Sequence, residues 1–280
     1  MWILDKPLLE DAIQDINKVI ANSNGVITDN DKPIITFLYR LYDHSNGVIE
    51  LDDNNRCREA VQNKLYSMYG THTYERQKLY GIRRDLFKLA TVCPMCGIGE
   101  PSQLDHQMPR SVYKSLSLCR LNLVPLCGVC NNKKRDKDYT KFVHPYYAIF
   151  PSGVIFLVAN IHVNEHKHIM SWKYTLELGG LSKDLAAKVE YQTSVIKLLN
   201  RLQKASNTYL SELFCFETFS TDAALKDFLR REMNKMIKLR GNNDWQTTLL
   251  RALFMSSKFR KEEANQFANR IRPFNHGANA

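Results

Sequence analysis

The chain has 280 residues, of which 44% are apolar, and it carries a formal net charge of +10. This size and composition allow a packed core in one large domain or in two or three small ones, without disulfide bonds. The longest strongly apolar run, residues 153–161, is too short to cross a bilayer, and the first residues lack the pattern of a secretory signal. We therefore expect a cytoplasmic protein that does not associate with membranes.

The basic surplus is unevenly spread along the chain. Residues 1–92 hold 12 Lys and Arg against 13 Asp and Glu, and residues 151–225 are balanced with 7 against 7. Residues 93–150 hold 8 against 4, and residues 226–280 hold 12 against 5. Because surplus positive charge favours phosphate backbones and other anionic surfaces, the last two segments are the candidate contacts for an anionic partner.

The first 92 residues predict a helical region. Apolar residues recur at helical spacing over residues 7–22 and 34–42, and two more helices are expected over 52–69 and 72–91. Core packing is the favoured interpretation of the aromatic residues in this part of the chain, and stacking on nucleic-acid bases is the alternative. These aromatic residues are Tyr66, Tyr69, Tyr74, Tyr80 and Phe87.

Residues 93–150 interrupt the helical periodicity with frequent prolines and glycines. Strand-like stretches follow at 153–163 and 171–178, and a helical pattern extends over 182–213. Two or three further helices with basic polar faces are expected over 222–272. The predicted fold class is therefore mainly α with a small α+β insert.

Three regions are expected from these patterns. They are a helical N-terminal region (1–92), a central region (93–150), and a strand pair followed by a basic helical C-terminal region (151–280). In the strand–turn region that includes the end of the first predicted strand, His162, His166 and His168 have a spacing that can bind metal, but a polar turn is the favoured interpretation.

Four of the seven cysteines form two close pairs, Cys93 with Cys96 and Cys127 with Cys130. In a reducing compartment such pairs indicate zinc before disulfides, because each turn directs two thiolates at one ion. Four thiolates complete a tetrahedral shell, so the predicted zinc is structural. The 30 residues between the pairs exceed the roughly 15–20 of ordinary zinc modules, which indicates an insert with a further purpose.

Asp105 and His106 lie side by side in this insert, in QLDHQMPRS (103–111), at the expected end of a strand. An adjacent Asp and His can divide two tasks, because a carboxylate oxygen suits a hard metal ion and an imidazole accepts a proton. Asn131 directly follows the last cysteine and is expected to open a helix. If the zinc holds this helix against the strand, Asp105 and Asn131 can share a magnesium-sized ion beside His106.

The order of these motifs resembles the zinc-stapled HNH endonucleases of the ββα-metal class. The resemblance rests on CPMC, LDHQMPRS and NLVPLCGVCNNKK and covers about residues 93–138. It implies a helical protein built around a zinc-bound ββα-metal core. The implied roles are metal ligand for Asp105, general base for His106, support of the loop for Asn122, and completion of the metal site for Asn131, with Asn132 as the alternative in a register shifted by one residue.

The resemblance implies hydrolysis of a phosphodiester bond assisted by Mg²⁺ or Mn²⁺. His106 would deprotonate a water that attacks phosphorus in line, while the ion stabilises the developing negative charge. The motif permits DNA or RNA, because the attacking water needs no 2′-hydroxyl. Basic residues around the motif are expected to hold flanking phosphates, with a solvated helix face as the alternative; they are Arg110, Lys133, Lys134, Arg135 and Lys137.

The flanking regions resemble the nuclease subunits of bacterial antiphage systems that act with an ATPase partner, such as the Septu type and its retron-linked relatives. This resemblance rests on the arrangement of the regions and on HPYY at 144–147, in which packing of His144 in a loop is favoured over a contact with the site or substrate. The alternatives are a stand-alone restriction-type DNA endonuclease and a non-catalytic zinc-ribbon adaptor that binds nucleic acid or protein.

Overall fold

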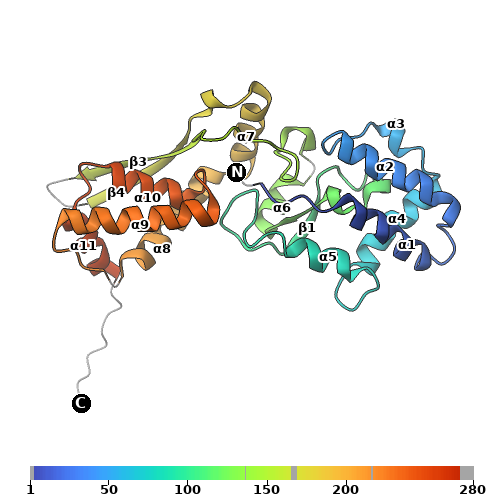
Figure 1. Ribbon diagram of the computed structural model, residues 1–280, viewed down its shortest axis with the longest axis horizontal. Helices are drawn as coiled ribbons and strands as arrows, with labels where there is room; N and C mark the ends of the chain where they lie inside the picture. Colours follow the sequence, from blue (N-terminus) through green and yellow to red (C-terminus); the bar gives the residue numbers. More distant parts are fainter. Residues whose placement is uncertain (1–2, 136, 165–168, 216, 272–280) are drawn as a thin grey trace, which may run out of the picture. The chain divides into compact units, whose positions relative to one another are not determined.

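The computed structural model describes residues 3–271 apart from 136, 165–168 and 216. The chain divides into two compact units, residues 1–149 and 150–280. Helices dominate both units, and each unit contains a two-stranded antiparallel sheet (Figure 1), which confirms the predicted fold class. Among the described helices none is both long and apolar enough to cross a membrane.

Unit 1 begins with helices whose apolar residues face a common core. The apolar face of α2, for example, buries Ile35, Leu38 and Tyr42, and Pro33 stands in its first turn, where proline fits best. The helix expected over 52–69 is divided in two. The helices are α1 (Leu9–Ala21), α2 (Lys32–His44), α3 (Leu51–Asn54), α4 (Glu59–His72) and α5 (Tyr80–Phe87), with a short 3-10 turn η1 (Asp29–Asp31) before α2.

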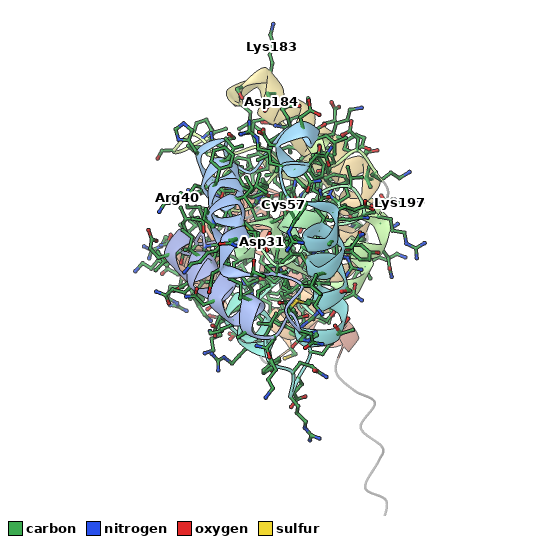
Figure 2. The ribbon with its side chains drawn as sticks, turned by 90° about the vertical axis from the view of Figure 1, so that its right-hand side faces the viewer. Asp31, Arg40, Cys57, Lys183, Asp184 and Lys197 are labelled. Atoms are coloured by element: carbon green, nitrogen blue, oxygen red, sulfur yellow. The ribbon has the colours of Figure 1, made fainter. Side chains whose placement is uncertain are left out.

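The helix expected over 72–91 is shorter than predicted. Arg76 adopts a left-handed backbone with φ of +66°, which ends helical continuity, and the helix resumes only at α5. The loops between these helices are held by side chains. Asp31, labelled in Figure 2, accepts hydrogen bonds from Arg58 Nε at 2.7 Å and from Arg58 Nη2 at 2.8 Å, which lowers the pKa of Asp31 well below its usual range.

The helices of residues 1–92 and the central region share one core. Leu38 and Leu65 from the helices cluster with Leu104 and Leu121 from the central region. A buried ion pair adds to this contact, because Arg120 Nε lies 2.5 Å from Asp15 of α1 and Arg120 Nη1 lies 3.3 Å from Asp85 of α5. The central region therefore packs as part of unit 1, and its position depends on the preceding helices.

The central region has a ββα arrangement. Strands β1 (Gln103–His106) and β2 (Leu123–Leu126) pair antiparallel, with Asp105 opposite Val124. Helix α6 (Gly128–Lys134) follows β2 after a single residue and packs against β1. The turns around them are η2 (Lys114–Leu116), η3 (Arg120–Asn122) and η4 (Tyr139–Lys141).

Unit 2 combines a hairpin with helices. Strand β3 (Leu157–Asn164) pairs with β4 (Ile169–Leu176), and the strand start expected at 153 moves to 157, where Asn243 Oδ1 accepts the N–H groups of Phe156 and Leu157. His162 is exposed on β3, and His166 and His168 lie outside the described residues. The remaining elements are η5 (Leu178–Gly180), α7 (Lys183–Val195), α8 (Leu198–Phe214), α9 (Asp222–Arg240), α10 (Trp245–Met255) and α11 (Lys261–Ile271).

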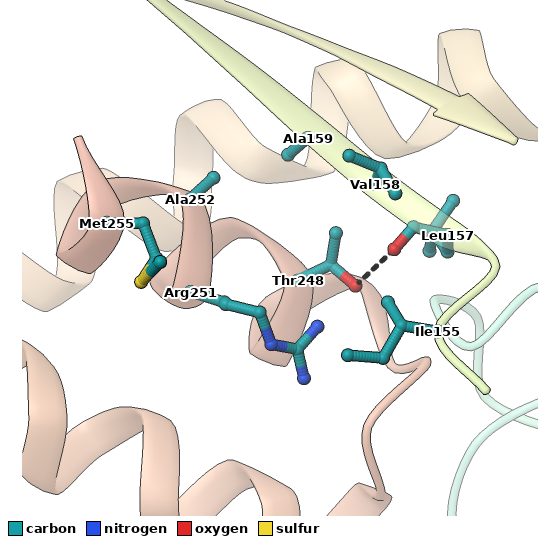
Figure 3. A pocket seen from close by; sticks show the side chains of 8 residues that line it. All are labelled: Ile155, Leu157, Val158, Ala159, Thr248, Arg251, Ala252 and Met255. Atoms are coloured by element: carbon teal, nitrogen blue, oxygen red, sulfur yellow. Dashed lines mark hydrogen bonds between the residues drawn. The ribbon is translucent and has the colours of Figure 1, made fainter. Parts of the chain in front are cut away.

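The helix expected over 182–213 is broken between α7 and α8. Lys197 has φ of +51°, a left-handed conformation that stops one helix and lets the next begin. Helix α10 packs against β3, where the Thr248 hydroxyl donates to the carbonyl oxygen of Leu157 at 3.2 Å, beside a mostly apolar pocket of about 200 Å³ (Figure 3).

Candidate functional site

Four cysteine side chains converge in the central region of unit 1. Their Sγ atoms lie within 4.8 Å of one another, and all four residues are buried. The Sγ atoms of Cys96 and Cys127 are 3.9 Å apart, close to the edge of about 3.8 Å expected for a tetrahedron with zinc–sulfur bonds of about 2.3 Å. Cys93, Cys96, Cys127 and Cys130 can therefore hold a zinc ion.

Two glycines let the first cysteine turn approach the second. Gly97 has φ of +67°, and its N–H donates to the carbonyl oxygen of Cys93 at 2.8 Å. Gly99 accepts the N–H of Cys93 at 2.8 Å, and a Cβ at position 99 would lie 2.8 Å from the Cβ of Cys127. Any larger residue at position 99 would displace Cys127, so this glycine is needed to join the turn to the start of α6.

Helix α6 faces β1 through two pairs of side chains. Lys134 Nζ lies 2.5 Å from Asp105 Oδ2, and one helical turn earlier Asn131 Nδ2 donates to Gln103 Oε1 at 2.6 Å. The pairs match in spacing, because residues three apart share a helix face and residues two apart share a strand face. Asn132 is exposed, so Asn131 is the asparagine that faces the strand.

Lys134 has a different environment from that of a phosphate-binding surface residue. Its side chain is only 4% exposed, and its ammonium also donates to the carbonyl oxygens of His106 at 2.9 Å and Gln107 at 3.4 Å. A buried ammonium needs such acceptors to offset its lost hydration. The pKa of Asp105 is raised, because burial disfavours the carboxylate more than the Lys134 ammonium favours it. The Lys134 ammonium is thus directed at Asp105.

His106 ends β1 with its imidazole held in one orientation. Its Nε2 lies 3.0 Å from the carbonyl oxygen of Ser117, and its ring meets the ring of Tyr69 edge-on at 4.4 Å between centroids. Because a carbonyl oxygen only accepts hydrogen bonds, Nε2 carries the proton and Nδ1 has the free lone pair. Burial lowers the pKa of His106 to about 3, so the ring is neutral at neutral pH and can accept a proton.

Asn122 is fully buried and uses all of its hydrogen-bonding capacity. Its Oδ1 accepts from the Met108 N–H at 2.8 Å and from the Tyr42 hydroxyl at 3.0 Å. Its Nδ2 donates to the carbonyl oxygens of Met108 at 3.2 Å and Leu116 at 3.4 Å. Asn122 therefore holds the backbone at Met108, two residues after His106.

His144 is half-buried and packs against Tyr42 and Tyr147, as favoured from the sequence. Its Nδ1 accepts the N–H of Tyr146 at 3.3 Å, and its Nε2 lies 3.0 Å from the Tyr42 hydroxyl oxygen. Nε2 therefore carries the proton and donates to Tyr42, whose own hydrogen is left for Asn122. Burial lowers the pKa of His144 to about 3, so this chain of hydrogen bonds holds a neutral ring.

The other basic residues of the motif lie around the ββα arrangement. Lys133 is half-buried on α6, whereas Arg135 and Lys137 are exposed just beyond it. The Arg110 guanidinium lies over the ring of Tyr66, 4.3 Å from its centroid. All four residues thus lie near the ββα arrangement, but their positions alone do not identify a ligand.

Sequence reasoning does not find two contacts of this site. Gln103 could have been found, because it lies two positions before Asp105 and must share its strand face. Tyr42 gives no local signal, because it is 80 positions from Asn122 and its spacing indicates only a core helix. Only the packing of α2 against the central region reveals its role.

Comparison with known proteins identifies the central region. The profile of the HNH endonuclease family matches residues 93–137, from the first cysteine of the cluster to just beyond α6. Protein ea31 of Escherichia phage lambda is 30% identical over 91 residues, and the match spans 30% of this chain and 31% of that protein. No solved structure matches the chain. Residues 93–137, called the HNH domain below, therefore match the HNH endonuclease family and carry a four-cysteine cluster suited to zinc.

Proposed function

We propose that this protein is a metal-dependent endonuclease that hydrolyses the phosphodiester bonds of nucleic acid. The observation that best supports the proposal is the end of β1, where the Asp105 carboxylate precedes a neutral imidazole with a lone pair on Nδ1. This pair lies within the HNH endonuclease domain. A carboxylate beside a neutral imidazole provides the metal ligand and the proton acceptor that metal-assisted hydrolysis requires.

The residues facing one another on β1 and α6 suit a hard divalent ion. Asp105 offers a carboxylate, and Asn131 offers its amide oxygen, because the amide nitrogen already donates to Gln103. The Lys134 ammonium at Asp105 supports the idea that this carboxylate attracts a cation. Asp105 and Asn131 would hold Mg²⁺ or Mn²⁺, which when bound would stabilise the negative charge that develops on the phosphate.

The protein's own residues would prepare His106 for proton transfer. The Ser117 carbonyl holds the proton on Nε2 and so leaves Nδ1 to accept a proton from the attacking water. Asn122 fixes the backbone after His106, and the cysteine cluster fixes the start of α6. In this proposal zinc has no chemical role, and it keeps Asn131 in register with β1.

Substitution of His106 tests the proposal. His106→Ala should reduce cleavage on the order of 100- to 10,000-fold and keep the zinc content, because loss of a general base leaves the packing of the cluster intact. Plasmid, single-stranded DNA and tRNA should each be incubated with and without Mg²⁺, to identify the substrate. Cleavage by His106→Ala at the wild-type rate would show that the proposed mechanism is wrong.

The metal ligands are tested separately. Asp105→Ala and Asn131→Ala should lose cleavage by weakening the divalent ion, so high Mg²⁺ or Mn²⁺ should restore part of their activity and none of that of His106→Ala. Asn132→Ala is the matched control, since this neighbouring asparagine is exposed, and it should cut at nearly the wild-type rate. The reverse result for the two asparagines would move the ligand to position 132.

The biological role forms a second part of the proposal. We propose a nuclease effector of a bacterial antiphage system that acts with an ATPase partner, on the basis of the helical regions around the HNH domain and the HPYY segment. Purification of the tagged protein from its native host should recover an ATPase. A nuclease that purifies alone and cleaves DNA at fixed sequences would favour the stand-alone restriction-type alternative.

A further inference from the structure

Helix α4 and the segment after β1 together form a row of side chains beside His106. The exposed face of α4 carries Asn63, Tyr66 and Gly70, at helical spacing. Lys114 Nζ donates to Asn63 Oδ1 at 2.8 Å, and Arg110 Nη1 lies 3.4 Å from the carbonyl oxygen of Tyr66. Two cations from the HNH domain therefore border an aromatic ring of the N-terminal helices.

The row leads directly to the proposed general base. The Arg110 guanidinium lies 4.3 Å from the centroid of Tyr66 and 4.8 Å from that of Tyr69. The Tyr69 ring in turn meets the His106 ring at 4.4 Å between centroids. Tyr69 is buried, whereas the Tyr66 side chain is 37% exposed. The exposed Tyr66 ring is thus linked to His106 through Arg110 and Tyr69.

A second stack of the same kind lies near Tyr69. The Arg83 guanidinium lies over Tyr74 at 4.5 Å from its centroid, and Tyr74 is 53% exposed. Arg83 Nε is buried and has no hydrogen-bond partner among the described residues. Arg83 and Arg110 both act electrostatically on the Tyr69 hydroxyl, so both stacks lie near that residue.

The positive charge of the N-terminal helices is concentrated in the segment that carries Tyr66 and Tyr74. Residues 60–91 hold 6 Lys and Arg against 2 Asp and Glu, whereas residues 1–59 hold 6 against 11. The near-neutral total for residues 1–92 hides this difference. Exposed tyrosines with basic neighbours match the surfaces that bind single strands, where aromatic rings stack on bases and cations hold phosphates.

We propose that Tyr66 and Arg110, with Tyr74 and Arg83 beside them, form a stacking surface for an unpaired base next to the cleaved phosphate. The proposal rests on the nuclease function proposed above, and it adds a substrate class, a strand with at least one unstacked base at the site. A base inside a duplex hides its π faces between its neighbours, so stacking on Tyr66 needs a single strand, an end, a loop or a flipped base.

Another arginine–aromatic stack in the same unit provides a matched control. The Arg56 guanidinium lies 5.1 Å from the centroid of Phe37, and Phe37 is 40% exposed, so its exposure resembles that of Tyr66. Arg56 is, however, ion-paired with Asp53 at 3.0 Å, within the acidic residues 1–59. Loss of Phe37 removes a comparable ring from the same unit without changing the row that leads to His106.

The experiment measures binding without cleavage, so it does not depend on catalysis. Full-length protein without added Mg²⁺ or Mn²⁺ is titrated against single-stranded DNA, single-stranded RNA and duplex DNA that carry 2-aminopurine. This base analogue loses fluorescence when it stacks on a ring, and anisotropy of a second label gives the affinity. The variants are Tyr66→Ala, Tyr66→Phe and Phe37→Ala.

We expect Tyr66→Ala to weaken single-strand binding about 5- to 150-fold and to remove part of the fluorescence quenching, since stacking on one ring contributes about 1–3 kcal/mol per base. Tyr66→Phe, which keeps the ring, should bind within about 2-fold of wild type. Phe37→Ala should bind like wild type, and duplex binding should not respond to Tyr66→Ala.

The proposal would be overturned if the wild-type protein quenched the 2-aminopurine fluorescence of none of the strands, or if Tyr66→Ala bound single strands as tightly as wild type. It would also be overturned if Phe37→Ala lost as much single-strand affinity as Tyr66→Ala. Failure of the nuclease proposal gives a different result. A protein that stacks bases through Tyr66 but never cleaves would refute only the nuclease function, and a protein that cleaves without any effect of Tyr66→Ala would refute only the stacking surface.

Discussion

The hydroxyl group of Tyr42 connects helix α2 to the HNH domain. It donates to Asn122 and accepts from His144, so one oxygen joins three segments that are far apart in the chain. Asn122 in turn holds the backbone after His106 through Met108. Tyr42 is therefore a positioning residue, which affects proton transfer only through the placement of His106.

Tyr42→Phe should reduce both stability and cleavage. The substitution keeps the ring but leaves one acceptor of Asn122 without its donor, which costs on the order of 1–3 kcal/mol of unfolding free energy. The loosened loop should lower kcat more than it raises KM, because His106 and not substrate binding is disturbed. Chemical denaturation and steady-state cleavage measure the two effects.

Tyr147→Phe is the control for this prediction. Tyr147 packs edge-on against Tyr42 at 6.1 Å between ring centroids, but its hydroxyl donates to Asp43 at 2.9 Å and not to Asn122. Its loss should destabilise unit 1 without a selective fall in kcat. Equal kcat losses in the two variants would assign Tyr42 a purely structural role.

At the scale of single residues, the sequence predicts the chemistry of a side chain better than it predicts whether that side chain is buried. Cysteine spacing is sufficient to predict the four-cysteine cluster. Each pair of cysteines separated by two residues directs two thiolates to one side, and two such pairs complete the shell of one zinc ion. The place of Lys134 cannot be predicted in the same way. Its three basic neighbours in the sequence suggest a solvated face, whereas its own side chain points inward to Asp105.

Helix α6 depends on its contacts with the rest of the HNH domain. It has only seven residues, and helices this short are unstable in isolation. The cysteine cluster at its start and the pairs Asn131–Gln103 and Lys134–Asp105 along its face provide the missing stability. Loss of the cluster should therefore release the face of α6 that carries Asn131.

Removal of one cysteine should unfold the central region. Cys130→Ala should abolish zinc binding and cooperative melting of this region, since structural zinc contributes directly to folding. Elemental analysis and thermal melting by circular dichroism provide the measurements. Cys57→Ala is the control, because Cys57 is an equally buried thiol outside the cluster, and it should keep zinc and lose on the order of 1 kcal/mol. A zinc-free wild type with full activity would contradict the prediction.

The buried Arg120 should be more important for stability than an exposed ion pair. Arg120→Leu leaves the buried carboxylate of Asp15 without its main partner, so we expect a loss of about 3–5 kcal/mol in unfolding free energy. Lys6→Ala breaks an exposed pair with Asp43 at 2.6 Å and should cost less than about 1 kcal/mol. Urea denaturation compares the two variants, and similar losses would show that Arg120 has no special role.

At the scale of elements, periodicity predicts where helices lie but not where they break. The pattern over 182–213 continues through Lys197, because a lysine gives no sign of the left-handed conformation that separates α7 from α8. Arg76 likewise gives no sign of its left-handed conformation, so the pattern does not show that the helix begins only at α5. Such breaks follow from packing of the flanking helices, which overrides local preference.

At the scale of the whole molecule, the spacing of apolar residues predicts a mainly helical protein with a small β component, and the two units confirm it. Composition does not predict that residues 1–92 share their core with the HNH domain. Their contact depends on Arg120 and on Tyr42, whose partners are 105 and 80 positions away. Contacts between such distant positions leave no pattern in a single sequence.

The second unit carries an exposed basic surface on α9. Arg231, Lys235 and Lys238 line a shallow hollow together with Asn234 and with Leu239, which is 68% exposed. Arg230 on the same helix is already paired with Asp227 at 3.0 Å. Lys235 is paired with Glu232 at 3.3 Å. If α9 contacts nucleic acid, Arg231 and Lys238 should therefore contribute more to binding than the paired Arg230 and Lys235.

A comparison of two double variants tests this role of α9. Arg231→Gln with Lys238→Gln should weaken binding of nucleic acid and lower the slope of log K against log salt by about 2, because each lost phosphate contact releases about one counterion fewer. Arg230→Gln with Lys188→Gln removes the same charge from unit 2 at residues that are already ion-paired, so it should change the slope less. Hydrolysis of a small phosphodiester should be unaffected in both, since the HNH domain is intact. Equal slopes for the two variants would mean that net charge, and not the surface of α9, draws nucleic acid to this protein.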